Sequence, residues 1–237
     1  MPSGLPSTVF LFDVDNTLLN HDRVTADLRR HLDEFVGPKS RRYWEIFEEL
    51  RTELGYADYL GALQRYRVEN LGDNQLLEVS YYLINYPFAH RLFPGSIDAV
   101  EYAQKLGTAV ILTDGDVVFQ PRKIYRSGLY ELFRGNVLIY IHKEQQLADV
   151  ECRYPADHYV VVDDKLRILT AIKEQWGSRV TTVFVRQGHY ALDEKANAQY
   201  VPADVTIETI AEFACLDATL LEAAAAPVRA EPNQPHW

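Results

Sequence analysis

Four carboxylates occur in two close pairs, and each pair directly follows a short apolar run. Asp13 and Asp15 stand two positions apart near the start of the chain, and Asp163 and Asp164 are adjacent in its second half. Carboxylates held together repel one another unless a cation lies between them, and Mg²⁺ prefers such hard oxygen ligands. The pairs therefore predict a magnesium site, although an Asx-rich turn after a strand would produce the first pair without any metal.

Groups that could bind an anion follow two other apolar runs. Thr113, Asp114 and Gly115 offer a hydroxyl group and backbone N–H groups in a tight turn, and Lys143 comes just after the next run. Lys123 is the competing lysine, but only ten residues separate it from Thr113. That interval is too short for a crossover helix and a further strand. We therefore expect Thr113 and Lys143 to share one site.

Together, these residue types are suited to the transfer of a phosphoryl group. A carboxylate can attack phosphorus and form an aspartyl-phosphate, which divides hydrolysis into two easier displacements. Mg²⁺ offsets the repulsion between that carboxylate and a phosphate dianion, while a lysine and a hydroxyl group bind the oxygens on which negative charge collects. A second carboxylate two residues on can protonate the leaving group and later deprotonate water.

Alternating strands and helices would bring these groups together. The apolar runs do not alternate cleanly with polar residues, which is typical of strands buried on both faces of a parallel sheet. Helical patterns separate most of them, so we expect an α/β fold with a Rossmann-like parallel sheet, whose strands end at one common edge. The expected strands are Thr8–Phe12, Thr108–Leu112, Asn136–Ile141, His158–Val162, Val180–Val185 and Asp204–Ile207.

Residues 21–89 interrupt this alternation, because they contain no convincing strand. Apolar residues recur there at helical spacing and predict four helices. The breaks between these helices are Gly37-Pro38, Gly55 and Gly72-Asp73. We interpret the segment as a separate all-helical domain inserted into a core formed by residues 1–20 and 90–221. Residues 222–237, which include three prolines, are expected to form a flexible tail.

Composition and charge argue against several other classes of function. The chain has 237 residues, with 24 Lys and Arg against 34 Asp and Glu, and a formal net charge of −10. This acid surplus disfavours binding to nucleic acid or to an anionic membrane, and no apolar run approaches the ~20 residues of a membrane helix. The N-terminus has no signal-peptide pattern, so we expect a cytoplasmic protein, monomeric or homodimeric. Cys152 and Cys215 are expected to be buried as small apolar residues.

The motifs resemble those of the haloacid dehalogenase (HAD) superfamily, and the resemblance covers nearly the whole chain. The segment Asp13–Thr17 reads as the Asp-x-Asp-x-Thr motif of the phosphatase branch, and Thr113 corresponds to the second motif. Lys143 is similar to the lysine of the third motif, and the pair Asp163-Asp164 to the acidic fourth motif. The helical insertion after the first motif resembles a C1-type cap.

This resemblance implies a Mg²⁺-dependent phosphatase that acts on a small phosphorylated metabolite. Asp13 would be the nucleophile, and Asp15 the general acid and base, with the backbone carbonyl of Asp15 completing the metal ligands. Asp164 would bind the metal directly, with Asp163 as its partner. Dehalogenases of the superfamily lack a carboxylate at the position of Asp15. The sequence departs from many relatives at Asp114, where they carry Asn, which leaves the substrate less certain.

Other functions stay open at this stage. A phosphosugar mutase would use the same residues, and a phospho-acceptor module or a non-catalytic binding protein would belong to other classes. Six carboxylates are expected in the site, with Lys143 as the one cation that faces them. They are Asp13, Asp15, Asp114, Asp116, Asp163 and Asp164. We therefore expect the protein to bind phosphate esters poorly without Mg²⁺.

Overall fold

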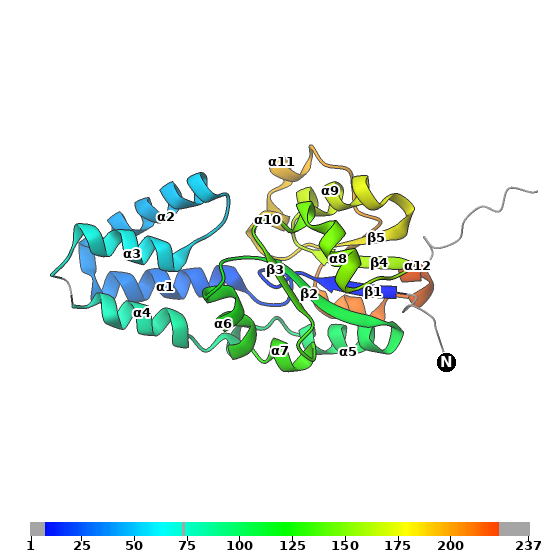
Figure 1. The fold of residues 1–237 in the computed structure, drawn as a ribbon, viewed down its shortest axis with the longest axis horizontal. Coiled ribbons are helices and arrows are strands. Elements are labelled where there is room, and N and C mark those ends of the chain that lie inside the picture. Colours follow the sequence, from blue (N-terminus) through cyan, green and yellow to red (C-terminus); the bar gives the residue numbers. More distant parts are fainter. Residues whose placement is uncertain (1–7, 73, 223–237) are drawn as a thin grey trace, which may run out of the picture.

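A six-stranded parallel sheet forms the centre of the molecule (Figure 1). The computed structural model describes residues 8–72 and 74–222. The strands lie in the order β3-β2-β1-β4-β5-β6, and every neighbouring pair is parallel. Their bounds are β1 Thr8–Phe12, β2 Thr108–Asp114, β3 Val137–Tyr140, β4 His158–Asp163, β5 Val180–Val185 and β6 Val205–Ile207. The six predicted strands and the parallel α/β fold are confirmed, with differences of at most two residues at the strand ends.

The central strand explains the lack of alternation in the sequence. All five residues of β1 are buried, and Phe10 pairs with Ala109 of β2 on one side and with Val160 of β4 on the other. Phe10 belongs to an apolar cluster on one face of the sheet, whereas its neighbours Val9 and Leu11 belong to a second cluster on the other face. Both faces are therefore apolar, as a covered parallel sheet requires.

Helices cover both faces of the sheet. The face of Phe10 packs against α5, whose residues Ala99 and Ala103 are fully buried, and the opposite face packs against α9 through Ile168 and Ile172. The helices of the core, in chain order, are α5 Ser96–Leu106, α6 Phe119–Arg126, α7 Leu129–Leu132, α8 Leu147–Arg153, α9 Leu166–Trp176, α10 His189–Leu192, α11 Glu194–Asn197 and α12 Ala218–Glu222.

The four helices α1–α4 lie between β1 and α5 and extend to one side of the sheet (Figure 1). They are α1 His21–Phe35, α2 Ser40–Leu54, α3 Tyr59–Glu69 and α4 Leu76–Asn85. These are the four predicted helices, and they end close to the predicted breaks. Leu28, Phe47 and Leu83 belong to the same apolar cluster as Phe10, so the helical insertion shares a continuous core with one face of the sheet.

A buried carboxylate ties the two ends of the insertion together. Asp27 of α1 accepts hydrogen bonds from the Tyr86 hydroxyl group at 2.6 Å and from Arg91 Nη2 at 2.7 Å. Tyr86 follows α4 directly, and Arg91 ends the short 3₁₀ segment Phe88–Arg91 that leads back to the sheet. Burial alone would raise the pKa of Asp27, but the bonds from Tyr86 and Arg91 outweigh it and lower that pKa.

Some expectations fail or fall outside the described part of the chain. Cys152 and Cys215 are both exposed, so the prediction that they are buried apolar residues is wrong. Each lies near the end of a short surface helix, where sequence pattern gives little information on burial. Within residues 8–72 and 74–222, no helix is long and apolar enough to cross a membrane. Residues 223–237 of the expected tail lie outside the described residues.

We predict that Asp27→Asn lowers the free energy of unfolding by about 1–3 kcal/mol at pH 7, because Arg91 loses its buried charged partner. The lowered pKa means that the carboxylate contributes its full stability above about pH 4, and that this contribution disappears as the pH falls through the pKa of the folded state. Urea unfolding of both proteins at about pH 7 and pH 3 measures the difference. A difference in the free energy of unfolding between wild type and variant that is the same at both pH values would contradict the stabilising role of the ionised Asp27.

Candidate active site

The carboxyl ends of the central strands carry the groups that the sequence singles out. Asp13 follows β1, Thr113 lies at the end of β2, and Asp163 ends β4, while Lys143 comes three residues after β3. All four side chains are buried. Because β1 lies between β2 and β4 in the sheet, its two neighbours hold Thr113 and Asp163 on either side of Asp13.

Lys143 joins two of these carboxylates. Its Nζ atom lies 2.6 Å from Asp13 Oδ1 and 2.6 Å from Asp163 Oδ2, and it also donates to the Leu112 carbonyl at 3.2 Å. The backbone N–H of Lys143 donates to Asp114 Oδ1 at 2.8 Å. The carboxylate of Asp114, expected from the sequence in phosphate binding, therefore fixes the segment that carries the lysine.

Three carboxylates at this edge could hold a metal ion. One oxygen from each of Asp13, Asp163 and Asp164 lies within 4.8 Å of the others. Asp13 Oδ2 and both oxygens of Asp164 are buried, with no hydrogen-bond partner among the described residues. Burial raises the pKa of Asp13 to about 6, although Lys143 opposes this, and burial also raises the pKa of Asp164. Unpaired buried carboxylate oxygens suit a hard divalent cation such as Mg²⁺.

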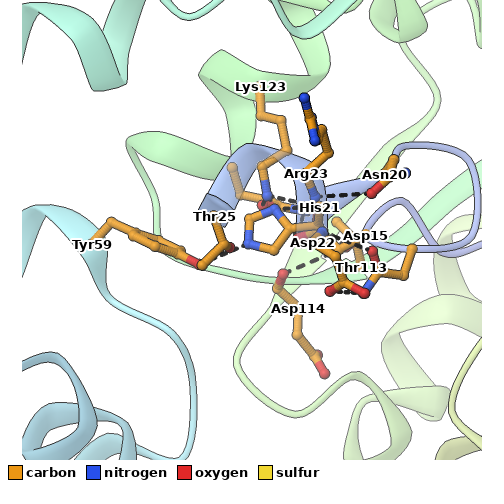
Figure 2. A network of polar contacts seen from close by, with 12 residues as sticks. Asp15, Asn20, His21, Asp22, Arg23, Thr25, Tyr59, Thr113, Asp114 and Lys123 are labelled. Atoms are coloured by element: carbon orange, nitrogen blue, oxygen red, sulfur yellow. Dashed lines mark hydrogen bonds and ion pairs between the residues drawn. The ribbon is translucent and has the colours of Figure 1, made fainter. Parts of the chain in front are cut away.

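Asp15 has different partners from Asp13. Lys123 Nζ donates to both of its carboxylate oxygens at 2.7 Å, and His21 Nδ1 lies 3.3 Å from Oδ1 (Figure 2). Burial alone would raise the pKa of Asp15, but His21 and Lys123 lower it to about 2. The side chain of Asp15 is thus outside the group of three carboxylates that could hold a metal ion. Its backbone carbonyl as a metal ligand stays a prediction.

The helical insertion contacts Asp15 through a chain of polar groups. His21 opens α1, and its Nε2 atom lies 2.9 Å from the Tyr59 hydroxyl group, which also contacts Thr25 Oγ1 at 2.9 Å (Figure 2). Burial lowers the pKa of His21 to about 4, so this ring is neutral near pH 7. His21 and Tyr59 were not predicted from the sequence as site residues. Only the position of His21, six residues after Asp15, could have drawn attention to it.

Thr113 is held by a glutamine that was not considered in the sequence analysis. Gln120 Nε2 donates to Thr113 Oγ1 at 3.0 Å, and Gln120 Oε1 accepts from Lys123 Nζ at 2.7 Å. The backbone N–H of Gly115 donates to the Tyr140 carbonyl at 2.9 Å, so it extends the sheet and is not free to bind phosphate here. A Cβ atom at position 115 would lie 2.6 Å from Gln120 Cβ. This close approach explains why the position is occupied by glycine.

The expectation that Lys143 alone faces the carboxylates is wrong. Lys123 pairs with Asp15. Lys165 follows Asp164 directly, and although burial opposes it, the charges of Asp164 and Asp13 raise the pKa of Lys165. Lys143, which the spacing favours over Lys123 as the lysine of the third motif, is the lysine that contacts Asp13. Spacing could not show that α6 brings Lys123 to Asp15.

A cleft of about 960 Å³ lies between the helical insertion and the edge of the sheet. The sheet side contributes Asp15, Lys123 and Lys165, and the insertion contributes aromatic and charged residues that include Trp44 and Arg51. Arg51 of α2 donates to the hydroxyl group of Tyr190 in α10 at 2.8 Å. The insertion therefore contacts the core through Arg51 and also through Tyr59, whose ring centroid lies 5.4 Å from that of Phe119 in α6.

Comparisons with known proteins agree with this arrangement. A family model described as haloacid dehalogenase-like hydrolase matches residues 8–175. A crystal structure of a haloacid dehalogenase-like hydrolase from Burkholderia xenovorans is similar, with 60% sequence identity over 89% of this chain and 99% of that chain and a TM-score of 0.85. No curated protein matches the chain.

More distant structures share the fold. The HAD-hydrolase YfnB from Bacillus subtilis, in a form bound to magnesium, has 19% identity over 86% of this chain and 96% of that chain, with a TM-score of 0.61. An L-2-haloacid dehalogenase from Xanthobacter autotrophicus, with chloropropionic acid covalently bound, has 14% identity over 87% of this chain and 96% of that chain, with a TM-score of 0.58.

We predict that Mg²⁺ raises the melting temperature of the protein, because it binds the folded state and relieves repulsion among the three buried carboxylates. Asp164→Asn should weaken the affinity for Mg²⁺ by about tenfold or more. Without metal, the same variant should melt at a higher temperature than the wild type. The raised pKa of Asp164 in the wild type means that its buried charge destabilises the fold at neutral pH, and the variant lacks this charge.

Isothermal titration calorimetry and thermal unfolding with and without Mg²⁺ measure these effects. Asp157→Asn is the matched control, since Asp157 is exposed in the loop before β4. Equal affinity for Mg²⁺ in the wild type and in Asp164→Asn would remove this residue from the metal site.

Proposed function

Because the chain belongs to the haloacid dehalogenase-like hydrolase family, we propose that it hydrolyses the phosphate monoester of a small metabolite, with Mg²⁺ as cofactor. One observation carries the proposal. The carboxylate of Asp15 stands at the cleft beside Lys123 and His21, apart from the three carboxylates around Lys143. A site with two carboxylates in such different environments can assign them different roles.

In this proposal Asp13 is the nucleophile. Lys143 holds Asp13 Oδ1 at 2.6 Å, which fixes the direction of the carboxylate and leaves Oδ2 without a partner among the described residues. A Mg²⁺ ion bound by Asp13, Asp163 and Asp164 would neutralise the repulsion between the nucleophile and a phosphate dianion. Thr113 and Lys143 would bind the phosphate oxygens on which charge develops.

Asp15 is proposed as the general acid and base. Its low pKa keeps it ionised while Lys123 and His21 are its neighbours, and only the ionised form can accept a proton from water. An incoming phosphate dianion would compete for Lys123 and place negative charge beside Asp15. Both effects raise the pKa of a carboxylate, in the direction that protonation of the leaving group requires. The helical insertion would act as a cap that excludes water from the cleft.

Two related reactions remain as alternatives to hydrolysis of a phosphate ester. A phosphosugar mutase would use the same carboxylates and return a rearranged phosphate ester. A dehalogenase would act on a carbon–halogen bond. That reaction has no evident use for Asp15 as a proton donor, or for Lys123 as the partner of Asp15. The pairing of Asp15 with Lys123 supports phosphoryl transfer over dehalogenation.

We predict that Asp13→Asn lowers kcat for p-nitrophenyl phosphate in the presence of Mg²⁺ by about 10³-fold or more, because the amide cannot act as the nucleophile. Asp98→Asn on the exposed surface of α5 is the control and should leave kcat unchanged. Substantial residual activity in Asp13→Asn would contradict the mechanism.

The same assay separates the alternatives. With 2-chloropropionate as substrate, the proposal predicts no chloride release from the wild type. With a panel of sugar phosphates, phosphorus NMR should show inorganic phosphate as the product. Rapid chloride release, or a rearranged sugar phosphate without inorganic phosphate, would replace the proposed function with a dehalogenase or a mutase.

A further inference from the structure

One face of α1 connects the site to the far part of the cleft. His21, Thr25 and Arg29 are four residues apart, so they share one face of the helix, and all three line the cleft. His21 lies 3.3 Å from Asp15. With a rise of 1.5 Å per residue, the Cα atom of Arg29 lies about 12 Å further along the axis. Figure 1 shows α1 running from the sheet edge into the insertion.

Arg29 differs in its partners from the neighbouring arginines of the same helix. Arg23 and Arg30 both form ion pairs with Asp27. Arg29 instead lies over the ring of Trp44, with its guanidinium carbon 4.2 Å from the ring centroid. Among the described residues, it has no carboxylate within 4.0 Å. Stacking on an aromatic ring holds a guanidinium group in place and leaves its N–H groups free to bind a carboxylate or phosphate in a bidentate manner.

A row of aromatic side chains joins Arg29 to the catalytic end of the cleft. Trp44 contacts Phe47, Phe47 contacts Tyr59, and Tyr59 contacts Phe119, with ring centroids 5.6, 4.6 and 5.4 Å apart. All four residues line the cleft. The row ends beside Lys123, whose Nζ atom lies 5.3 Å from the centroid of Phe119. The two cationic ends of the cleft are thus connected by a row of contacting aromatic rings.

Two other cationic side chains of the cleft already have partners. Arg51 also lines it, but Arg51 donates to Tyr190 at 2.8 Å and lies 3.5 Å from Glu48. Lys123 is paired with Asp15. Arg29 is therefore the guanidinium group in the described part of the cleft that has an aromatic support and no acidic partner.

From this arrangement we infer that the substrate is an elongated phosphate ester with a second anionic group, which Arg29 binds on the order of 10 Å from the catalytic carboxylates. The body between the two anionic groups is apolar or aromatic and packs along the row from Trp44 to Phe119. This inference rests on the proposed phosphatase function and names the class of its substrate. The second anionic group is a carboxylate or a phosphate, since both suit a bidentate guanidinium group.

The test compares matched substrates. Alkyl phosphates, ω-carboxyalkyl phosphates and α,ω-alkane bisphosphates of increasing chain length are assayed with Mg²⁺. For the wild type, a second anionic group should raise kcat/KM by about 10- to 100-fold over the plain alkyl phosphate, and only above a minimum chain length. The carboxylate and bisphosphate series show which anion Arg29 prefers.

The variants assign the effect to one residue. Arg29→Ala should abolish the preference for a second anion and leave kcat/KM for short alkyl phosphates within about twofold. Arg29→Lys keeps the charge and should retain part of the preference. Arg41→Ala is the control, because Arg41 is a highly exposed arginine of the insertion that does not line the cleft. Equal melting temperatures establish that the variants are folded.

The outcomes separate this inference from the proposed function. Hydrolysis of alkyl phosphates with no gain from a second anion, or with a gain that persists in Arg29→Ala, would overturn the inference and leave the phosphatase intact. Failure of the wild type to hydrolyse any of these esters would overturn both. A length-dependent gain that is lost in Arg29→Ala and partly restored in Arg29→Lys supports the inference.

Discussion

The contact of Lys143 with Asp13 and Asp163 is the interaction on which the site depends. Burying several carboxylates at one edge of a sheet is costly unless a positive charge lies among them. Lys143 supplies that charge from a position after β3, and Asp114 holds its backbone. The contact forms because β1 lies between β2 and β4, so the strand order of the sheet and the charge balance of the site support each other.

The two carboxylates of the first motif illustrate how environment assigns roles. Asp13 and Asp15 are two residues apart, yet burial raises the pKa of Asp13 to about 6, whereas His21 and Lys123 lower that of Asp15 to about 2. Each carboxylate has its own lysine, one from the segment after β3 and one from α6. The helical insertion adds His21 and Tyr59, so the environment of Asp15 depends on the insertion as well as on the core.

Contacts along the edge of the sheet could be predicted from the sequence, and contacts that depend on the packing of helices could not. The apolar runs fix the strands, and parallel strands end at one edge, so the convergence of Asp13, Thr113, Lys143 and the acidic pair follows from the order of the elements. The partners of Asp15 depend on how α1, α3 and α6 pack, which periodicity does not determine. The exposure of Cys152 escaped prediction for a similar reason, since it depends on which side of a short helix meets the core.

The central claim, a phosphoryl group carried by Asp13, is tested most directly by acid quenching during turnover. The wild type, mixed with p-nitrophenyl phosphate and Mg²⁺ and quenched within one turnover, should contain a peptide that carries one phosphoryl group on Asp13, identified by fragmentation mass spectrometry. The acyl phosphate should disappear when the quenched protein is treated with hydroxylamine. Turnover without a phosphorylated peptide, or with the phosphoryl group on another residue, would contradict the account.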